Sequence, residues 1–259
     1  MGNMENSIKT GMEFSVDVAW QAGKIIMRYY NTGISPDWKN DNSPVTVADH
    51  EAEQFIRNMI LQSFPDDGLV GEEFGNIESK SGFTWFIDPI DGTKSFVQGV
   101  PLFGVLLARQ SPNGMDLGCV YMPALDEMIW AGRGHGCWWD GRRARVSDVS
   151  KLEDSCICFT SPVNFAQNSR KNEWDNLSNA SRLVRGWGDC YGHILVATGR
   201  AEASFDPIMN PWDCGPLLPI LEEAHGTFTD WNGKATINGK DAFSTNGLVF
   251  KEVMELIGN

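Results

Sequence analysis

The sequence of 259 residues predicts a layered α/β fold with a soft boundary near residue 150. Near the N-terminus, apolar residues recur every three or four positions, as on the buried face of a helix. The middle of the chain carries short apolar runs separated by turn residues, which is typical of hairpins. After residue 150, strand-like and helix-like segments alternate. Elements that each bury one face favour a layered sandwich.

The N-terminal half, residues 1–150, is expected to begin with two helices. The first helix stops at Gly33, and its apolar face is formed by Ile8, Met12, Val16, Ala19, Gly23, Ile26 and Tyr30. The polar stretch 31–45 is rich in turn formers and predicts a long loop or hairpin. Thr46 can cap the second helix, which ends at Phe64-Pro65.

Strands are expected next in LVGEEFG, TWFID, FGVLLARQ, GMDLGCVYMP and EMIWAGRG. We expect TWFID to end at Asp88, because Pro89 cannot continue a sheet ladder. The last two segments form a hairpin pair.

The C-terminal half, residues 151–259, is expected to alternate strands and helices. It contains a strand in CICFTSP, a helical stretch through Trp174 and Leu183, and a helix in DCYGHILVATG that ends at Gly199. A strand in AEASFDP precedes a helix in PWDCGPLLPILEEAHG. Pro219 within that helix should kink it or shift its start.

The net charge of −13 argues against nucleic acid and anionic membrane as partners, since both attract basic proteins. The apolar runs are too short to span a membrane. The start of the chain has no basic-then-apolar signal pattern. Six cysteines without a CxxC pair suggest a reducing compartment, so we expect a cytoplasmic protein.

The segment FIDPIDGTK places two carboxylates, Asp88 and Asp91, directly after an apolar run. Gly92 allows a close approach to a ligand. The free amides that begin a helix at Thr93 attract an anion such as phosphate. Carboxylates this close repel each other unless one is protonated or a metal neutralises them. Mg²⁺ prefers such oxygen ligands, but an ordinary Asp turn with a helix cap explains this segment equally well.

Further acids at the ends of predicted elements favour a site. Glu72 and Glu73 follow the strand before Asp88, and Asp213 and Asp49 lie near helix starts. Each aspartate near a helix start could serve as a cap alone. Their joint occurrence at element ends is what indicates a metal centre.

The motifs GEE, WFIDPIDGTKSF and PWDCGPLLPILEEAHG resemble the signatures of the inositol monophosphatase-like, metal-dependent phosphatases. The order and spacing agree over roughly residues 8–257. The last motif has His225-Gly226 where the family usually has two glycines. The resemblance implies an αβαβα layered sandwich, a homodimer, and Mg²⁺-assisted hydrolysis of a phosphate monoester.

Carried over residue by residue, the resemblance implies two to three Mg²⁺ ions. The metal ligands would be Glu72, Asp88, the carbonyl of Ile90, Asp91 and Asp213. The resemblance also implies that Thr93 and Asp49, with Glu72, orient and deprotonate the attacking water. The amides of Gly92 and Thr93 would bind phosphate oxygens, next to Asp91 and Asp213.

Within the family, RGWGDCYGHILVATGRAEASFDPIMNPWD is most similar to the histidinol-phosphatase branch. Histidinol phosphate carries an ammonium group, and Asp189 and Asp206 are the candidate anions for it. A helix cap at Asp189 and a turn at Asp206 are the alternatives. Two other functions stay open: an inositol-1-monophosphatase or broad-specificity sugar or nucleotide phosphatase, and a non-catalytic interaction protein on the same fold.

Overall fold

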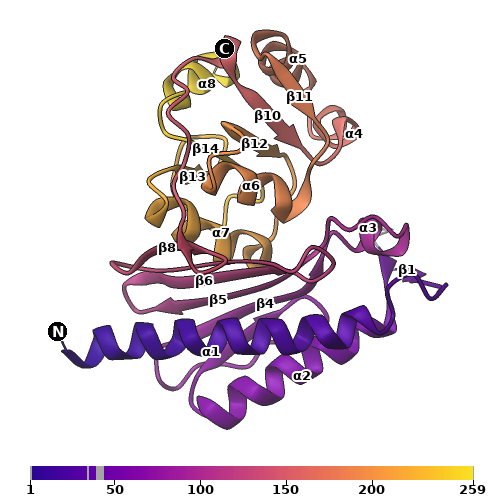
Figure 1. The fold of residues 1–259 in the computed structure, drawn as a ribbon, viewed down its shortest axis with the longest axis vertical. Coiled ribbons are helices and arrows are strands. Elements are labelled where there is room, and N and C mark those ends of the chain that lie inside the picture. The colour runs from indigo at the N-terminus through magenta and orange to yellow at the C-terminus, as the bar shows by residue number, and fades with distance from the viewer. Residues whose placement is uncertain (1, 34, 39–43, 259) are drawn as a thin grey trace.

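The structure is a computed structural model that describes residues 2–33, 35–38 and 44–258, with side chains from Ser7 onward. Figure 1 shows five layers stacked along the long axis of the molecule, which alternate between helices and sheets. The expected αβαβα sandwich is confirmed.

The first layer consists of α1 (Gly2–Met27) and α2 (Val47–Ser63), which pack on one another and on the larger sheet (Figure 1). The expectation that the first helix reaches Gly33 is wrong. The helix ends at Met27, where the N–H groups of Arg28 and Tyr29 donate three residues back, to Ile25 and Ile26, in place of the helical four. The left-handed residue Asn31, with φ of 58°, then prevents the helix from resuming.

The expected hairpin is present in part as β1 (Asp37–Trp38) and β2 (Pro44–Val45), which pair antiparallel. Residues 34 and 39–43 of the predicted 31–45 segment lie outside the described residues.

The second layer is a seven-stranded sheet in which the strands follow one another in chain order. Only the first pair is parallel, and the others are antiparallel. The strands are β3 (Gly68–Gly71), β4 (Thr84–Asp91), β5 (Gly104–Ser111), β6 (Gly114–Met122), β7 (Glu127–Gly132), β8 (Gly136–Trp139) and β9 (Arg142–Arg143). A short helix, α3 (Thr93–Val97), follows β4 directly.

The third layer consists of α6 (Asp189–Ala197) and α7 (Pro211–Glu223), between the two sheets (Figure 1). A β-carbon added to Gly118 of β6 would lie 2.2 Å from the carbonyl oxygen of Pro216, so glycine permits the close approach of α7. The helix begins at Pro211 and continues through both Pro216 and Pro219 to Glu223.

The fourth layer is a five-stranded sheet in the order β11-β10-β12-β14-β13. Its strands are β10 (Cys156–Phe159), β11 (Leu183–Arg185), β12 (Ala203–Asp206), β13 (Thr227–Thr229) and β14 (Ala242–Thr245). The prediction of helix through Leu183 is wrong. Leu183 begins β11, which pairs in parallel with β10, and backbone pairing at the sheet edge overrides its helix propensity.

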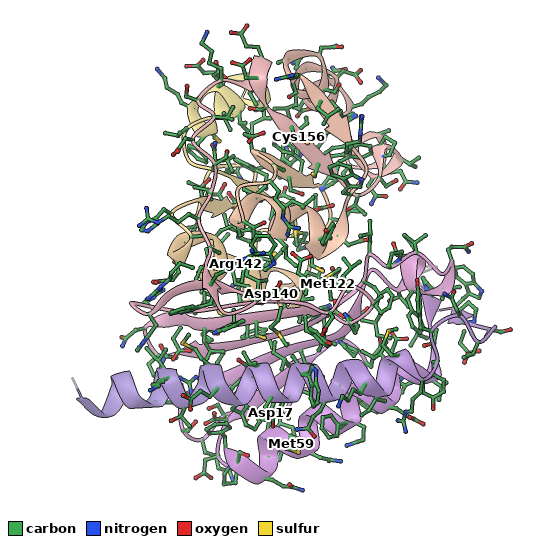
Figure 2. All side chains as sticks on the ribbon, viewed as in Figure 1. Asp17, Met59, Met122, Asp140, Arg142 and Cys156 are labelled. Atoms are coloured by element: carbon green, nitrogen blue, oxygen red, sulfur yellow. The ribbon has the colours of Figure 1, made fainter. Side chains whose placement is uncertain are left out.

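The fifth layer covers the outer face of this sheet (Figure 1) with α4 (Pro162–Gln167), α5 (Lys171–Ala180) and α8 (Phe250–Ile257). A 3₁₀ turn, η1 (Leu152–Asp154), precedes β10. Apolar clusters fill each space between layers. In Figure 2, Met59 of α2 and Cys156 of β10 lie on opposite sides of the seven-stranded sheet. Among the described residues, no helix has the length and apolarity needed to cross a bilayer.

Candidate active site

A bulge in β4 turns Asp88 and Asp91 toward the same place. Asp88 pairs with Leu106 and Asp91 with Gly104, so three steps along β4 match two steps along β5. Side chains three residues apart would point to opposite faces of a regular strand, and the extra residue corrects this. The expectation that the strand ends at Asp88 is therefore wrong, because the bulge lets the strand pass Pro89 and continue to Asp91.

Asp213 comes to these two carboxylates from the first turn of α7. One carboxylate oxygen from each of Asp88, Asp91 and Asp213 lies within 4.8 Å of the others. We call these three residues the acidic cluster. The backbone N–H of Asn210 donates to Asp213 Oδ2 at 2.7 Å in a capping box. Asp213 therefore caps α7 and also places a carboxylate oxygen close to those of Asp88 and Asp91.

Burial makes the negative charges of the acidic cluster costly. Asp88 is 2% exposed, and burial raises its pKa well above the usual range, helped by the charges of Glu72, Asp91 and Asp213. Burial, followed by the charge of Asp213, raises the pKa of Asp91 to about 7. Burial likewise raises the pKa of Asp213 to about 7. The site therefore favours either protons or a cation among its carboxylates.

Glu72 follows β3 and lies beside Asp88. Its charge and a hydrogen bond between the two side chains contribute to the raised pKa of Asp88. The turn that carries Glu72 is held by a buried residue of α2, Glu53. Glu53 accepts hydrogen bonds from the backbone N–H groups of Glu73 at 2.8 Å and Phe74 at 3.3 Å. Sequence reasoning missed Glu53, although an acid within the apolar face of a helix is a usable signal.

Thr93 and Asp49 lie together at the edge of the acidic cluster. The Thr93 hydroxyl is 2.8 Å from the carbonyl oxygen of Ile90 and 3.5 Å from Asp49 Oδ1. Asp49 Oδ2 accepts from the backbone N–H and hydroxyl of Thr46, at 2.8 and 2.7 Å. Burial, partly offset by the hydrogen bonds from Thr46, raises the pKa of Asp49 to about 7. Asp49 is thus both a helix cap and a buried acid facing Thr93.

Gly92 and Asp189 meet across the two halves of the chain. Gly92 has a φ of 81°, which glycine adopts without strain. A β-carbon at Gly92 would lie 3.3 Å from Asp189 Oδ2, so this carboxylate borders the predicted phosphate-binding turn. The charges of Asp91 and Asp206, after burial, raise the pKa of Asp189 well above its usual range.

Asp189 is held by its backbone and not by a cap interaction of its side chain. The N–H of Asp189 donates to Thr160 Oγ1 at 2.7 Å. The N-cap residue of α6 is Gly188, which has no side chain that could cap the helix. The next N–H, from Cys190, donates to Asp91 Oδ2 at 2.5 Å. Thr160 and Cys190 were missed by sequence reasoning, because their roles depend on contacts between distant segments.

Asp206 ends β12 and is 5% exposed. Its Oδ2 lies 3.1 Å from Nε2 of His193. The structure thus gives Asp206 a buried imidazole partner, whereas the sequence suggested a turn or an anion facing the substrate. The predicted roles of all these residues in metal and substrate binding stay predictions.

The residues present fit a hard divalent cation. The acidic cluster supplies three carboxylates, Glu72 lies beside it, and oxygen donors of this kind suit Mg²⁺. The Ile90 carbonyl accepts from Thr93 and keeps a second lone pair available.

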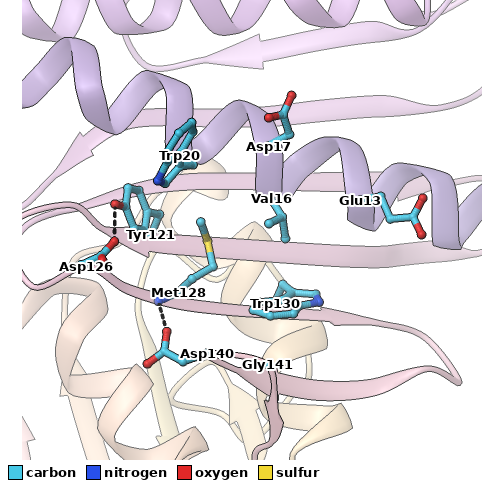
Figure 3. A pocket seen from close by; sticks show the side chains of 10 residues that line it. All are labelled: Glu13, Val16, Asp17, Trp20, Tyr121, Asp126, Met128, Trp130, Asp140 and Gly141. Atoms are coloured by element: carbon cyan, nitrogen blue, oxygen red, sulfur yellow. Dashed lines mark hydrogen bonds between the residues drawn. The ribbon is translucent and has the colours of Figure 1, made fainter.

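A separate cavity of about 440 Å³ lies between α1, strands β6 and β7 and the turn that follows β8, on the other side of the sheet from α7 (Figure 3). Trp20 and Trp130 line it together with acids such as Asp17. This cavity shares no residue with the acidic cluster, so it is not part of the candidate active site.

The inositol monophosphatase family model matches residues 8–257. A histidinol-phosphatase of Chlorobaculum parvum is 42% identical over 250 residues, which cover 96% of each chain. A fructose-1,6-bisphosphatase/inositol-1-monophosphatase of Thermotoga maritima is 32% identical, over 95% of each chain. The crystal structure of the extragenic suppressor protein suhB from Bartonella henselae superimposes with a TM-score of 0.90 at 27% identity, and covers 96% of this chain and 98% of that one.

Proposed function

The chain belongs to the inositol monophosphatase family, and from this premise we propose that it is a Mg²⁺-dependent phosphatase that hydrolyses histidinol phosphate to histidinol and phosphate. The observation that carries the metal dependence is the acidic cluster, in which three carboxylate oxygens lie within 4.8 Å. Three carboxylates this close repel one another unless they take up protons or a counter-cation, and a divalent cation would neutralise them without protonation.

The choice of histidinol phosphate is supported by charge near the predicted phosphate turn. Asp189 borders Gly92, and Asp206 raises the pKa of Asp189 through its charge. Two carboxylates beyond the phosphate would attract a substrate with an ammonium group and disfavour a neutral polyol. The Chlorobaculum relative named as a histidinol-phosphatase supports the same choice.

The positions of the residues suggest which of them would bind metal and which would bind phosphate. Asp88, Asp91 and Asp213, with Glu72 and the carbonyl of Ile90, would hold two to three Mg²⁺ ions. When bound, such ions lower the pKa of a water molecule and stabilise the leaving oxygen. The N–H groups at Gly92 and Thr93, in the first turn of α3, would orient the phosphate oxygens.

Thr93 and Asp49 would handle the proton of the attacking water. The Thr93 hydroxyl donates its proton to the Ile90 carbonyl at 2.8 Å and lies 3.5 Å from Asp49 Oδ1. If this one proton turned toward Asp49, the hydroxyl would accept from water while it donates to Asp49. A carboxyl group with a pKa of about 7 is matched to proton exchange near neutral pH.

A substrate panel tests the proposal. Phosphate release would be measured with purified protein and Mg²⁺ on histidinol phosphate, inositol 1-phosphate and 3′-phosphoadenosine 5′-phosphate. We expect the highest kcat/KM on histidinol phosphate. A higher value on either other ester would overturn the choice of substrate and leave the phosphatase assignment in place.

A broad-specificity inositol or sugar phosphatase is the second candidate. The Thermotoga relative named as a fructose-1,6-bisphosphatase/inositol-1-monophosphatase favours it. Comparable kcat/KM values across the panel, with fructose 1,6-bisphosphate added, would select this candidate.

A binding role without catalysis is the candidate of another class. The presence of Glu72, Asp88, Asp91, Thr93 and Asp213 in one place argues against it. Thermal unfolding with Mg²⁺ and phosphate separates the two, since a ligand of the folded state raises the Tm. No shift, together with no phosphate release, would support the binding role.

We also propose that the protein is a homodimer, on the strength of the family membership. Light scattering coupled to size-exclusion chromatography would measure this, and a mass near 28.7 kDa would contradict it.

A further inference from the structure

His193 of α6 is buried between two polar partners from the five-stranded sheet. Its Nε2 lies 3.1 Å from Asp206 Oδ2 at the end of β12, and its Nδ1 lies 2.8 Å from Ser244 Oγ of β14. The side chain is completely buried. Close packing of α6 on the sheet allows this reach, because a β-carbon at the adjacent Gly192 would lie 2.4 Å from Ser204 Oγ.

The hydrogen-bond chemistry fixes the direction of the contact with Asp206. An ionised carboxylate only accepts, so Nε2 must carry the proton and donate it to Asp206. The hydroxyl of Ser244 can then donate to Nδ1 of a neutral imidazole. Without this donor, the Asp206 oxygen would lose the hydrogen bond that holds it in place.

Asp206 lies near the start of α6, because its partner His193 follows Asp189 by four residues and therefore lies on the same face of that helix. Its charge acts on Asp91, on Asp189 and on the thiol of Cys214, from β4, α6 and α7 respectively. One carboxylate oxygen is fixed by His193. The proposed substrate would place its ammonium group between this carboxylate and Asp189.

We propose that His193 is a positioning residue that keeps the Asp206 carboxylate oriented toward a cationic substrate. This inference rests on the proposed function, since it concerns the same site and its preference for an ammonium group. His193 acts through Asp206 and has no direct contact with the phosphate.

A purely structural role for His193 would have a different signature. The imidazole packs edge-on against Phe228, with ring centroids 5.6 Å apart, as a core residue would. Loss of packing alone would lower the activity on every phosphate ester by the same factor. Loss of a positioned carboxylate would act selectively on cationic substrates and mainly through KM.

The test compares the ratio of kcat/KM on histidinol phosphate to kcat/KM on glycerol 2-phosphate, whose alcohol is neutral. We expect His193→Leu to lower this ratio about tenfold or more, mainly through a higher KM for histidinol phosphate. His193→Gln retains an N–H donor and should keep a ratio closer to that of the wild type. Ser244→Ala removes the second partner and should shift the ratio in the same direction by a smaller factor.

Ser204→Ala is the matched control. Ser204 pairs with Ser244 across β12 and β14, and its buried hydroxyl has no hydrogen-bond partner among the described residues. It should leave the ratio unchanged. If His193→Leu does not fold, His193→Gln and Ser244→Ala carry the test.

The outcomes are distinguishable. A wild-type protein that prefers the neutral ester would refute the proposed function and, with it, this inference. A wild-type preference for histidinol phosphate, with equal losses on both esters in the His193 and Ser244 variants, would leave the function standing and refute the positioning role. A ratio of the two kcat/KM values that stays unchanged in all variants would refute the positioning role as well.

Discussion

Asp88 and Asp91 acquire their chemistry from one extra residue in β4. Without the bulge the two side chains would point to opposite faces of the sheet, and only one could reach Asp213. Burial then raises the pKa of each carboxyl group, which makes the cluster a strong site for a cation. Function at this scale depends on backbone geometry as much as on residue type.

Asp189 gives the sharpest test of substrate choice among single residues. Asp189→Asn keeps the size of the side chain and removes its charge. We expect kcat/KM on histidinol phosphate to fall about tenfold or more, because a buried charge pair with the ammonium is lost. On glycerol 2-phosphate the loss should be small. Equal losses on both esters would make Asp189 a scaffold residue.

Thr93 tests the proton path. Thr93→Ala removes the hydroxyl, and we expect kcat to fall about 10²–10⁴-fold, the usual contribution of a positioned proton-transfer group. Thr93→Ser keeps the hydroxyl and is the matched control, with most of the activity retained. Steady-state kinetics at saturating Mg²⁺ measure both. A fully active Thr93→Ala variant would contradict the role.

At the scale of elements, α7 is the part that joins the two sheets. It packs on β6 so closely that Gly118 meets the backbone of Pro216, and its first turn carries Asp213. Any change that pushes α7 away from β6 should therefore disturb both stability and the acidic cluster.

Gly118→Ala should destabilise the fold by about 1–3 kcal/mol, the typical cost of overpacking. The reason is that its β-carbon would lie 2.2 Å from a backbone oxygen, which cannot rotate away. Gly75→Ala is the control, since its β-carbon would meet nothing within 4 Å. Urea denaturation of both variants measures the free energy of unfolding. Equal stability of the two would refute the steric argument.

The sequence predicted the layered fold, because periodicity and turn chemistry are local, and the structure does bring Asp88, Asp91 and Asp213 together. It failed at the bulge of β4 and at Leu183, where pairing between strands decides the conformation. It also missed the imidazole partner of Asp206, since that contact joins α6 to β12. Contacts between residues that are far apart in the chain cannot be predicted from local patterns in a single sequence.

At the scale of the whole molecule, the net charge of −13 and the buried acids make stability depend on protons and metal. In the unfolded chain these aspartates titrate near pH 4. In the metal-free folded protein, burial raises the pKa of Asp49, Asp91 and Asp213 to about 7. Between these values the folded state binds more protons than the unfolded state, so stability falls as the pH rises.

We therefore expect the Tm of the chelated protein to fall from pH 5 to pH 7.5. Mg²⁺ should raise the Tm most at the upper end of this range, where the carboxylates are ionised. Differential scanning calorimetry with EDTA or Mg²⁺ measures both effects. A Tm of the chelated protein that rises through this range, or that Mg²⁺ does not change at pH 7.5, would contradict the account.

The central claim is that the acidic cluster holds the metal that drives hydrolysis of histidinol phosphate. The most direct measurement is phosphate release from histidinol phosphate by chelated protein during titration with Mg²⁺, for the wild type and for Asp213→Asn. We predict no release without metal, full recovery with Mg²⁺ in the wild type, and a weakened or absent recovery in Asp213→Asn. Release that is independent of Mg²⁺, or identical titrations for the two proteins, would contradict the claim.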